Sequence, residues 1–563
     1  MNKYIGLSLI ALSMGLASCD DFLDTLPDNR TEANTEEKIE RLLVSAYPVK
    51  NHITLTEFSS DNMDDMGESN PNTERILDEI WHWKDVTESS DEAPEDFWES
   101  CYQCVETANL ALEGIEQMGG ATTTALKEAK AEALLCRAYA HFLLVNIFAQ
   151  HYDSNNPEAI GVSYITSTET ELNPQYQRET VHENYKHIAA DLEAALPDVG
   201  DSYHTVPKYH FNKNAAYAFA TRFYLYYEKY DKVIDFANRI LGSNPKTMLR
   251  DYEYMSTITR SEDAYTLHYI DASLNCNIML LTTYGSVGWY FGNYYDGKRY
   301  THNRYIGEHE TLNGVAGLWN GDYTSYFYEV GRYEGTNINT WLYWHMPFGR
   351  SVFEYTDPVA GIGYRHSVYN AFTGDEVLLN RAEAYTMTRE FDKAAADLTL
   401  WMQNASRTAS RSGMTLTADY IKDYMNSINY SYDVYEDVNG TEQLVSSRGI
   451  YSTLKKHLNP KFTIDAEGSV QESLIQCVLG MRRIDTLHEG KRWFDIKRWG
   501  IVIPRRVLDS AGNPSEAIDW LEIDDPRRAV QIPQRVREAG YQPNARGVAT
   551  DNNASMLPSN YLK

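Results

Sequence analysis

Two stretches of the chain share one spacing of aromatic, small and large apolar residues, and this spacing restricts the fold more than any other feature. Its offsets are those of the tetratricopeptide repeat, a helix-turn-helix unit of about 34 residues. The stretches lie about 160 residues apart, so long insertions interrupt the repeat. They carry Tyr217, Ala220, Thr221, Tyr224, Val233, Ala237, Ile240 and Pro245, and then Leu378, Arg381, Ala382, Tyr385, Ala394, Leu398 and Trp401. We predict a mostly α-helical fold of tetratricopeptide-type helix pairs with long loop-rich insertions.

Apolar residues at spacings of three and four predict further helices. Residues 32–46 and 97–115 each carry one apolar stripe. Residues 126–148 carry two, so we expect this helix to be buried on two sides. The segment 182–196, which ends before Pro197, is its expected partner, and the two helices are a candidate third repeat.

Cys101 and Cys104 form a Cys-x-x-Cys motif on the apolar side of the helix predicted over 97–115. The sequence holds no second pair of this kind, so buried structural thiols are favoured over a redox or zinc site. Of the 6 cysteines, setting Cys19 apart leaves an odd number, which does not indicate a disulfide framework.

The main insertion, about 250–370, has no helical period and is rich in Gly, Asn and aromatic residues. Loops held on a rigid scaffold commonly carry function. We therefore expect the insertion to contribute a functional surface to one large domain.

A dense mixture of charged and aromatic residues occupies Met481–Gly500. On a helix, Arg492 and Arg498 can each reach Asp495 at a distance of three residues. The rings of Trp493 and Trp499 can pack beneath the guanidinium groups.

The acidic stretch Asp61–Glu68 raises the question of calcium. It fails the EF-hand pattern because the twelfth position from Asp61 is Asn72 and not Glu. An irregular Ca²⁺ site stays open, but a solvated acidic loop is the favoured interpretation. We expect no cofactor and no metal site.

The amino terminus has the three parts of a secretory signal: basic Lys3, the apolar run Ile5–Leu16, and the small residues before Cys19. The apolar run is too short to span a bilayer. Leu16-Ala17-Ser18-Cys19 resembles the bacterial lipobox, in which the thiol is acylated, for example with palmitate. We predict a signal peptide over 1–18 and one domain over 19–563, anchored to a membrane through Cys19. The alternative is an ordinary signal peptide.

The mature chain is strongly acidic. Lys3 is the only basic residue of the signal, so 51 basic residues become 50 against 80 acidic ones, a formal charge of −30. Such a surface repels nucleic acid and anionic lipid, so we expect neutral or cationic partners.

Several motifs together resemble the SusD/RagB family of outer-membrane nutrient-binding lipoproteins. They are the lipobox with its acidic Cys19–Asp24 tether, Arg137–Tyr139, Arg381–Tyr385, Glu489–Gly500, and the closing Asp525-Pro526-Arg527 with Ile532-Pro533. One departure is Met481-Arg482-x-x-Asp485-Thr486, which keeps only the Arg of the family's Glu-Arg-x-x-Glu-Leu.

The resemblance implies a SusD-like fold with about four tetratricopeptide-like helix pairs and a ligand surface built from loops. It also implies a location on the outer membrane, facing the exterior of a Gram-negative cell of the Bacteroides type. The implied partner is a SusC-like TonB-dependent barrel, which the lipoprotein covers as a lid.

In the starch-binding member of this family, an arc of aromatic rings holds the glycan. Trp81-His82-Trp83 is similar to the family's early Trp-x-Trp motif, and aromatic faces suit the C–H faces of sugars. The expected ligand-binding residues are Trp81, Trp83, Trp289, Tyr290 and Trp319, the last three chosen only by position and local composition. For any single Trp, the alternative is a core residue.

The expected function is non-catalytic capture of a polysaccharide or oligosaccharide and its delivery to the barrel. One alternative is capture of peptides on the same scaffold, as the RagB branch implies. A glycosidase would need two carboxylates about 5 to 10 Å apart, which sequence spacing does not reveal. Pure scaffolding would leave the aromatic surplus of the insertion unexplained.

Overall fold

The computed structural model describes residues 33–67, 70, 72–169, 176–258, 262–285, 287–291, 299–327, 331–334, 341–344 and 352–546. The predicted signal peptide and Cys19 lie outside these residues. Side chains are described for them except at 262–263, 288–289, 331–334, 341–344 and 352–354.

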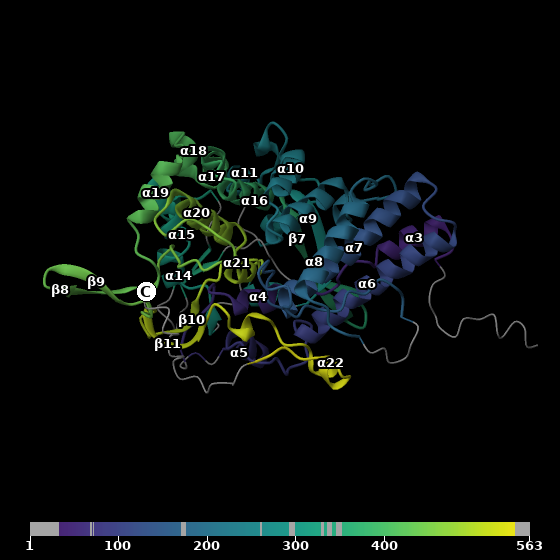
Figure 1. The fold of residues 1–563 in the computed structure, drawn as a ribbon, viewed down its shortest axis with the longest axis horizontal. Coiled ribbons are helices and arrows are strands. Elements are labelled where there is room, and N and C mark those ends of the chain that lie inside the picture. The colour runs from purple at the N-terminus through teal and green to yellow at the C-terminus, as the bar shows by residue number, and fades with distance from the viewer. Residues whose placement is uncertain are drawn as a thin grey trace, which may run out of the picture.

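Long helices pack in pairs and form the scaffold (Figure 1). The predicted repeats are present as α9 with α10 and α16 with α17, and the candidate third repeat is α7 with α8. Helix α19 packs on α20 as a fourth pair, and α6 covers α7. Their bounds are α6 (Pro94–Gln117), α7 (Thr124–Phe148), α8 (Val181–Ala195), α9 (Lys213–Tyr226), α10 (Tyr230–Leu241), α16 (Gly374–Met387), α17 (Phe391–Ala405), α19 (Ala418–Asn426) and α20 (Val470–Asp485).

Helix α7 is the core helix of this scaffold. It is long and apolar enough to cross a membrane, but the whole apolar stretch is buried inside the protein, as its two apolar stripes predict. On α6, Cys101 and Cys104 are buried and free, which confirms the prediction of buried thiols.

Local chemistry sets the ends of these helices. The Asn212 side chain accepts a hydrogen bond from the Ala215 amide at the start of α9, and Thr373 does the same for Glu376 at the start of α16. Helix α10 ends at Gly242, whose φ of 57° favours glycine.

The insertion contains short helices and a sheet that the absence of a helical period did not predict. Strands β2 (Asn277–Tyr284), β7 (Ile362–Thr373) and β6 (Val352–Asp357) form an antiparallel sheet in the order β2-β7-β6. In β2, the consecutive residues Ile278–Leu281 are all buried. The strand therefore lacks the alternation that marks a half-buried strand.

A second sheet gathers four segments that are distant in sequence. Its order is β11 (Pro514–Leu521), β10 (Ile503–Leu508), β1 (Asp64–Asp65) and β3 (Tyr300–Thr301). It joins the acidic stretch after α4, the insertion and the carboxyl-terminal region.

A hairpin of β8 (Val434–Val438) and β9 (Thr441–Ser446) projects from the body (Figure 1). Its turn is Asn439-Gly440, with φ values of 58° and 81°. Asn-Gly is a strong hairpin signal. The sequence could therefore have predicted this hairpin, although the surrounding region has no clear helical or strand pattern.

The shorter elements complete the fold. They are α3 (Glu36–Leu43), α4 (Ile53–Ser59), α5 (Arg75–Trp81), α11 (Tyr252–Met255), α12 (Glu262–Tyr269), α13 (Val287–Phe291), α14 (Arg304–His309), α15 (Leu312–Ala316), α18 (Arg407–Ser412), α21 (Arg492–Arg498), α22 (Gln534–Glu538), β4 (Gly331–Glu334), β5 (Trp341–Trp344), and the 3₁₀ turns Pro207–Tyr209, Pro245–Met248, Gly317–Trp319, Tyr323–Ser325 and Pro526–Arg528.

A buried ionic network connects the loop-rich half of the protein to α20 and β10. Its hub is Glu310, whose carboxylate lies 2.7 Å from the Lys456 Nζ and 2.8 Å from guanidinium nitrogens of both Arg483 and Arg506. All four side chains are nearly inaccessible to solvent. Three positive groups around one carboxylate lower the pKa of Glu310 well below its usual range despite the opposing effect of burial.

The same network corrects the interpretation of Asp61–Glu68 as a solvated loop. Asp61, Asp64 and Asp65 are buried, and each binds arginine: Asp61 pairs with Arg492, Asp64 with Arg506 and Asp65 with Arg299. A buried carboxylate needs such a partner to offset its lost hydration. The sequence shows the acids but not the distant arginines.

The prediction for Met481–Gly500 is right in one part and wrong in another. Arg498 lies 3.3 Å from Asp495, and Trp493 and Trp499 are buried. Arg492 does not pair with Asp495; its Nε lies 2.8 Å from Asp61. As the first residue of α21, Arg492 points to the buried Asp61 carboxylate instead.

We expect Glu310→Gln to lower the free energy of unfolding by about 3–5 kcal/mol, because it leaves buried cations without their shared carboxylate. Urea denaturation measures the change. Glu308→Gln is the matched control, since Glu308 sits two residues away in a partly exposed pair with Arg304 and should cost no more than about 0.5 kcal/mol. Equal effects of the two changes would contradict the role of the hub.

Candidate functional site

The two tryptophans of the early motif are buried. The Trp81 ring stacks on Tyr300 with centroids 4.7 Å apart, and its indole N–H donates to the Met63 carbonyl. The Trp83 indole N–H donates to the Ser59 carbonyl, and the Arg505 guanidinium lies 3.8 Å from its ring centroid. Both rings are therefore held by the protein itself.

Two of the candidates from the insertion, Tyr290 and Trp319, are also buried and hydrogen-bonded within the protein. The Tyr290 hydroxyl donates to Glu74 over 2.9 Å, and the Trp319 indole N–H donates to the Ser325 hydroxyl over 2.9 Å. Both side chains are buried. Trp289 belongs to α13, but its side chain lies outside the described residues.

These contacts favour the core alternative for the four described candidates. None presents an open ring face in this conformation, because their exposed fractions are 6% or less. Trp83 borders a cavity.

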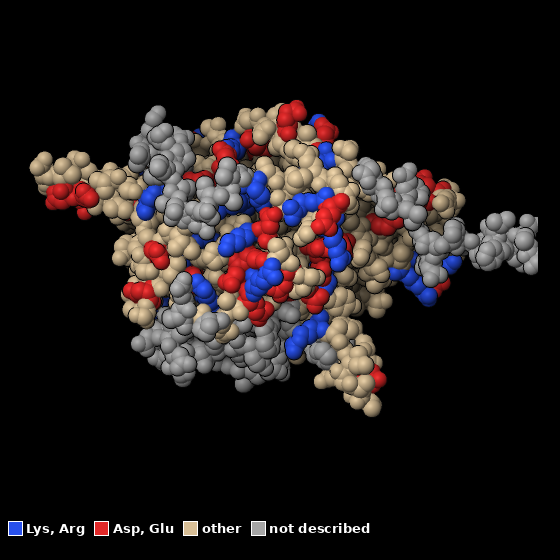
Figure 2. Space-filling view, turned by 90° about the horizontal axis from the view of Figure 1, so that it is seen from below, with Lys and Arg blue, Asp and Glu red and all other residues tan. Residues whose placement is uncertain are grey.

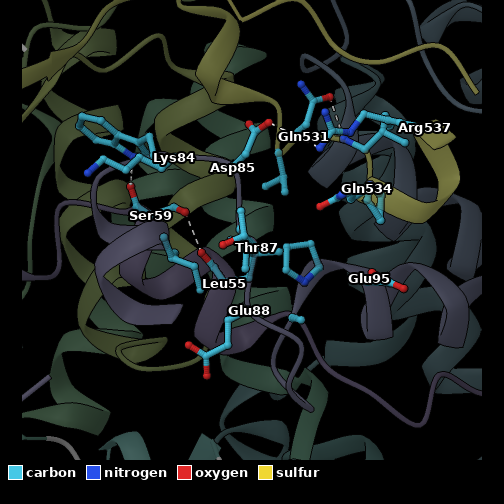
Figure 3. A pocket seen from close by; sticks show the side chains of 18 of the residues that line it. Leu55, Ser59, Lys84, Asp85, Thr87, Glu88, Glu95, Gln531, Gln534 and Arg537 are labelled. Carbon is cyan, nitrogen blue, oxygen red and sulfur yellow. Dashed lines mark hydrogen bonds and ion pairs between the residues drawn. The ribbon is translucent and has the colours of Figure 1, made fainter. Parts of the chain in front are cut away.

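The Trp83 cleft lies between the segment after α5 and residues 527–546 (Figure 3). Asp85 is held there by Arg546, at 2.9 Å, and by Arg537, at 3.7 Å. Thr87 and Gln534 also line it. Its volume is about 70 Å³, well below the roughly 300–1,000 Å³ of typical ligand pockets.

A larger cavity, here called the aromatic trough, lies between α6 and the segment that contains Val536 and Tyr541. It has a volume of about 440 Å³, which is within the range of ligand pockets. Its lining combines aromatic rings, aliphatic groups and carboxylates, and includes Trp98, Tyr102, Tyr176, Tyr541, Ile165, Val536, Glu99, Gln103, Glu106 and Glu169.

The local sequence explains how α6 builds one wall of the trough. Pro94 occupies the first turn of α6, where a missing amide is tolerated. Trp98 and Tyr102 are four residues apart, so they lie on the same face of the helix, and their ring centroids are 5.0 Å apart. Glu99 and Glu106 lie on the neighbouring, more exposed side of the helix.

Tertiary contacts fix the second wall. The Tyr541 hydroxyl accepts a hydrogen bond from the Ser163 amide over 2.9 Å, and the Tyr102 hydroxyl donates to the Ser163 carbonyl over 3.0 Å. The Tyr541 ring meets Trp98 edge-on at 5.5 Å. Spacing on α6 could have suggested Trp98 and Tyr102, but nothing in the sequence places Tyr541 beside them.

The face seen from below the view of Figure 1, where α5 and α22 lie, has charged side chains of both signs intermixed over its centre (Figure 2). The negative charge of the chain therefore does not dominate this face.

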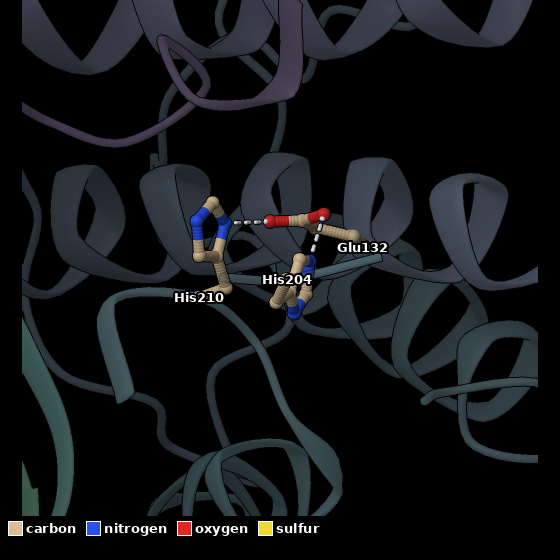
Figure 4. A group of neighbouring side chains, drawn as sticks. All are labelled: Glu132, His204 and His210. Carbon is tan, nitrogen blue, oxygen red and sulfur yellow. Dashed lines mark hydrogen bonds and ion pairs between the residues drawn. The ribbon is translucent and has the colours of Figure 1, made fainter. Parts of the chain in front are cut away.

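One cluster away from the trough combines residues that often bind metals. Glu132 of α7 lies 3.0 Å from the His204 Nε2 and 2.8 Å from the His210 Nδ1 (Figure 4). The hydroxyls of Tyr47 and Tyr203 donate to the same carboxylate.

The geometry of this cluster fits a hydrogen-bonded carboxylate better than a metal centre. The two imidazole rings are stacked with an interplanar angle of 14° and a centroid separation of 4.0 Å. In-plane lone pairs of parallel rings do not converge on one point, and each ring already contacts its own carboxylate oxygen. Burial raises the pKa of Glu132, but the hydrogen bonds from His204 and His210 overcome this and lower it to about 2.

Comparisons with known proteins identify the fold. Residues 21–225 match a SusD-like family model described as starch-binding and associating with the outer membrane. A SusD superfamily protein of Bacteroides thetaiotaomicron has a TM-score of 0.61 and 17% identity, with 91% of this chain and 100% of that chain covered. The fold is therefore that of SusD-like proteins, and residues 21–225 are similar to the SusD-like family.

Other SusD-like structures agree in fold. A putative sugar binding protein of Bacteroides vulgatus has a TM-score of 0.61 and 17% identity, covering 92% and 99% of the two chains. A SusD-like carbohydrate binding protein of the same species has a TM-score of 0.56 and 13% identity, covering 90% and 96%. No curated protein matches the sequence. The SusD-like fold with mostly helical structure is thus confirmed.

We expect Glu132→Gln to destabilise the protein at neutral pH by about 3 kcal/mol, since it removes a buried charge that accepts hydrogen bonds from four side chains. The folded pKa of about 2 lies below the ordinary 4.5. The stabilisation is therefore present above pH 4.5 and is lost as the pH falls toward 2.

Thermal unfolding from pH 7 to pH 3 measures both effects. The difference in Tm between the wild type and Glu132→Gln should shrink as the pH falls. Glu116→Gln, on exposed α6 surface, is the control. A difference that stays constant with pH would contradict the role of the charge.

Proposed function

We propose that this SusD-like protein is a lipid-anchored, outward-facing lipoprotein of the outer membrane that binds an oligosaccharide and delivers it to a TonB-dependent SusC-like barrel without catalysis. The observation that carries the binding role is the aromatic trough. The family match supports carbohydrate binding and outer-membrane association.

The chemistry of the trough suits a sugar. The exposed or partly exposed rings of Tyr102, Tyr176 and Tyr541 offer apolar surface that matches the C–H faces of a pyranose, whereas Trp98 is only 5% exposed. The partly exposed carboxylates and the amide of Gln103 at its edge can accept or donate hydrogen bonds to hydroxyl groups. The volume of about 440 Å³ accommodates a short glycan segment and not a whole polymer.

Peptide capture is the second candidate. Glu99, Glu106 and Glu169 line the trough, and carboxylates favour Lys or Arg side chains over neutral sugars. Affinity for basic peptides with none for any glycan would select this candidate.

We expect Tyr541→Ala to weaken glycan binding about tenfold, because an aromatic contact contributes about 1–1.5 kcal/mol. Tyr541→Phe keeps the ring face and should retain affinity. Calorimetry against a panel of neutral oligosaccharides measures the change, and Tyr451→Ala, at an exposed tyrosine outside the trough, is the control.

Two results would contradict parts of this proposal. Unchanged affinity in Tyr541→Ala, with its thermal stability intact, would overturn the trough as the ligand site. Accumulation of hydrolysis products from a bound glycan would overturn the non-catalytic role.

The anchor makes a separate prediction. Cys19→Ala should leave ligand affinity in solution intact and abolish uptake, since an acyl chain holds the binding domain beside its transporter. Growth on the cognate glycan measures uptake. Unimpaired growth of the variant strain would contradict the role of the anchor.

A further inference from the structure

A third cavity borders the carboxyl-terminal segment (residues 523–546) and shares no lining residue with the aromatic trough. It has a volume of about 540 Å³ and sits between the loop after α7 and the end of α21. The polar residues that distinguish it are His151, Arg178, Lys461, Lys497, Arg528 and Asn544. We call it the cationic cavity.

Positive groups outnumber negative ones in this lining. Against the four Lys and Arg side chains stand only Asp153 and Asp524. Asp524 already pairs with Lys461 at 2.5 Å. In a chain with 80 acidic and 51 basic residues, an excess of cations around a cavity runs against the overall composition.

Lys497 is buried without an ion pair to any described carboxylate. Its Nζ donates to the carbonyls of Asn146 and Ala149, at 2.5 and 2.6 Å, at the end of α7. Burial and the nearby Arg528 lower the pKa of Lys497 to about 7. Titratable groups with a shifted pKa that border a cavity are candidates for a functional site.

His151 provides an independent observation. Its Nε2 is buried and has no hydrogen-bond partner, which is uncommon for a polar atom in a native fold. Burial lowers the pKa of His151 to about 3, with further lowering by Lys497, Arg498 and Arg528. The imidazole is therefore neutral and sits in a positive field.

Apolar groups form the rest of the wall, among them Ile160, Ile523 and Pro526. A small inorganic anion would leave most of this space and apolar surface unused. A pyranose ring that carries a carboxylate matches both the apolar wall and the positive groups.

We propose that the cationic cavity binds a uronic acid residue, with the carboxylate directed to the lysines and arginines and with His151 hydrogen-bonded to a sugar hydroxyl. This site is distinct from the trough and adds a preference for acidic glycans to the capture of neutral ones. It requires no catalytic step.

Calorimetry of the purified mature protein at low salt tests the proposal with trigalacturonate, neutral galactotriose and sodium sulfate as separate probes. We expect trigalacturonate to bind at least about tenfold more tightly than galactotriose. Its affinity should fall as salt is added. Sulfate should bind much more weakly than trigalacturonate.

Variants locate the site. Lys461→Gln, at a partly exposed side chain, should weaken trigalacturonate binding about threefold, and Arg178→Gln about tenfold. His151→Phe should also weaken trigalacturonate binding, because the larger phenyl ring fills part of the cavity. Lys393→Gln, at an exposed lysine of α17 outside the cavity, is the matched control. Thermal melts show whether each variant is folded.

Three results would overturn the proposal. They are equal affinity for trigalacturonate and galactotriose, sulfate binding as tight as that of trigalacturonate, and unchanged affinity in folded Lys461→Gln and Arg178→Gln. Tyr176→Ala, in the trough, should leave trigalacturonate binding intact, so failure of the trough and failure of the cationic cavity are distinguishable.

Discussion

The structure depends on a set of charges that are buried together. Glu310 follows α14, and its cationic partners come from the loop before α20, from α20 itself and from β10. Each group alone would be costly to bury, but each is paired and hydrogen-bonded. The network thereby ties the loop-rich insertion and the second sheet to the helical scaffold.

The carboxyl-terminal segment is the second organising feature. It contributes to the Trp83 cleft, the aromatic trough and the cationic cavity. Arg528 holds it in place by donating to carbonyls of Ile496 and Ile501, and Asn544 donates to the Phe148 and Val530 carbonyls. Backbone contacts of this kind make an irregular segment a rigid wall between cavities.

Sequence reasoning succeeded where the signal is local. The pairs α9–α10 and α16–α17 follow from spacings within about 34 residues, and burial of Cys101 follows from its place on an apolar helix face. Prediction from the sequence failed where the interaction partner of a residue lies far away in the chain. Arg492 has a carboxylate three residues away, yet it binds Asp61. Residues Ile278–Leu281 of strand β2 form an unbroken run of buried apolar side chains, and such a run has no period to detect.

The sequence by itself determined the helical scaffold, the resemblance to SusD/RagB proteins and the motif of the proposed lipid anchor, since each rests on spacings or motifs within short segments of the chain. The tertiary structure alone decided which aromatic rings are exposed. Trp81 and Trp83 resemble a sugar-binding motif, but their indole groups are satisfied by backbone carbonyls and an arginine. Tyr541 meets Trp98 only because the carboxyl-terminal segment folds back over α6. Whether a ring binds ligand or fills a core depends on what packs against it, and that partner can lie hundreds of residues away.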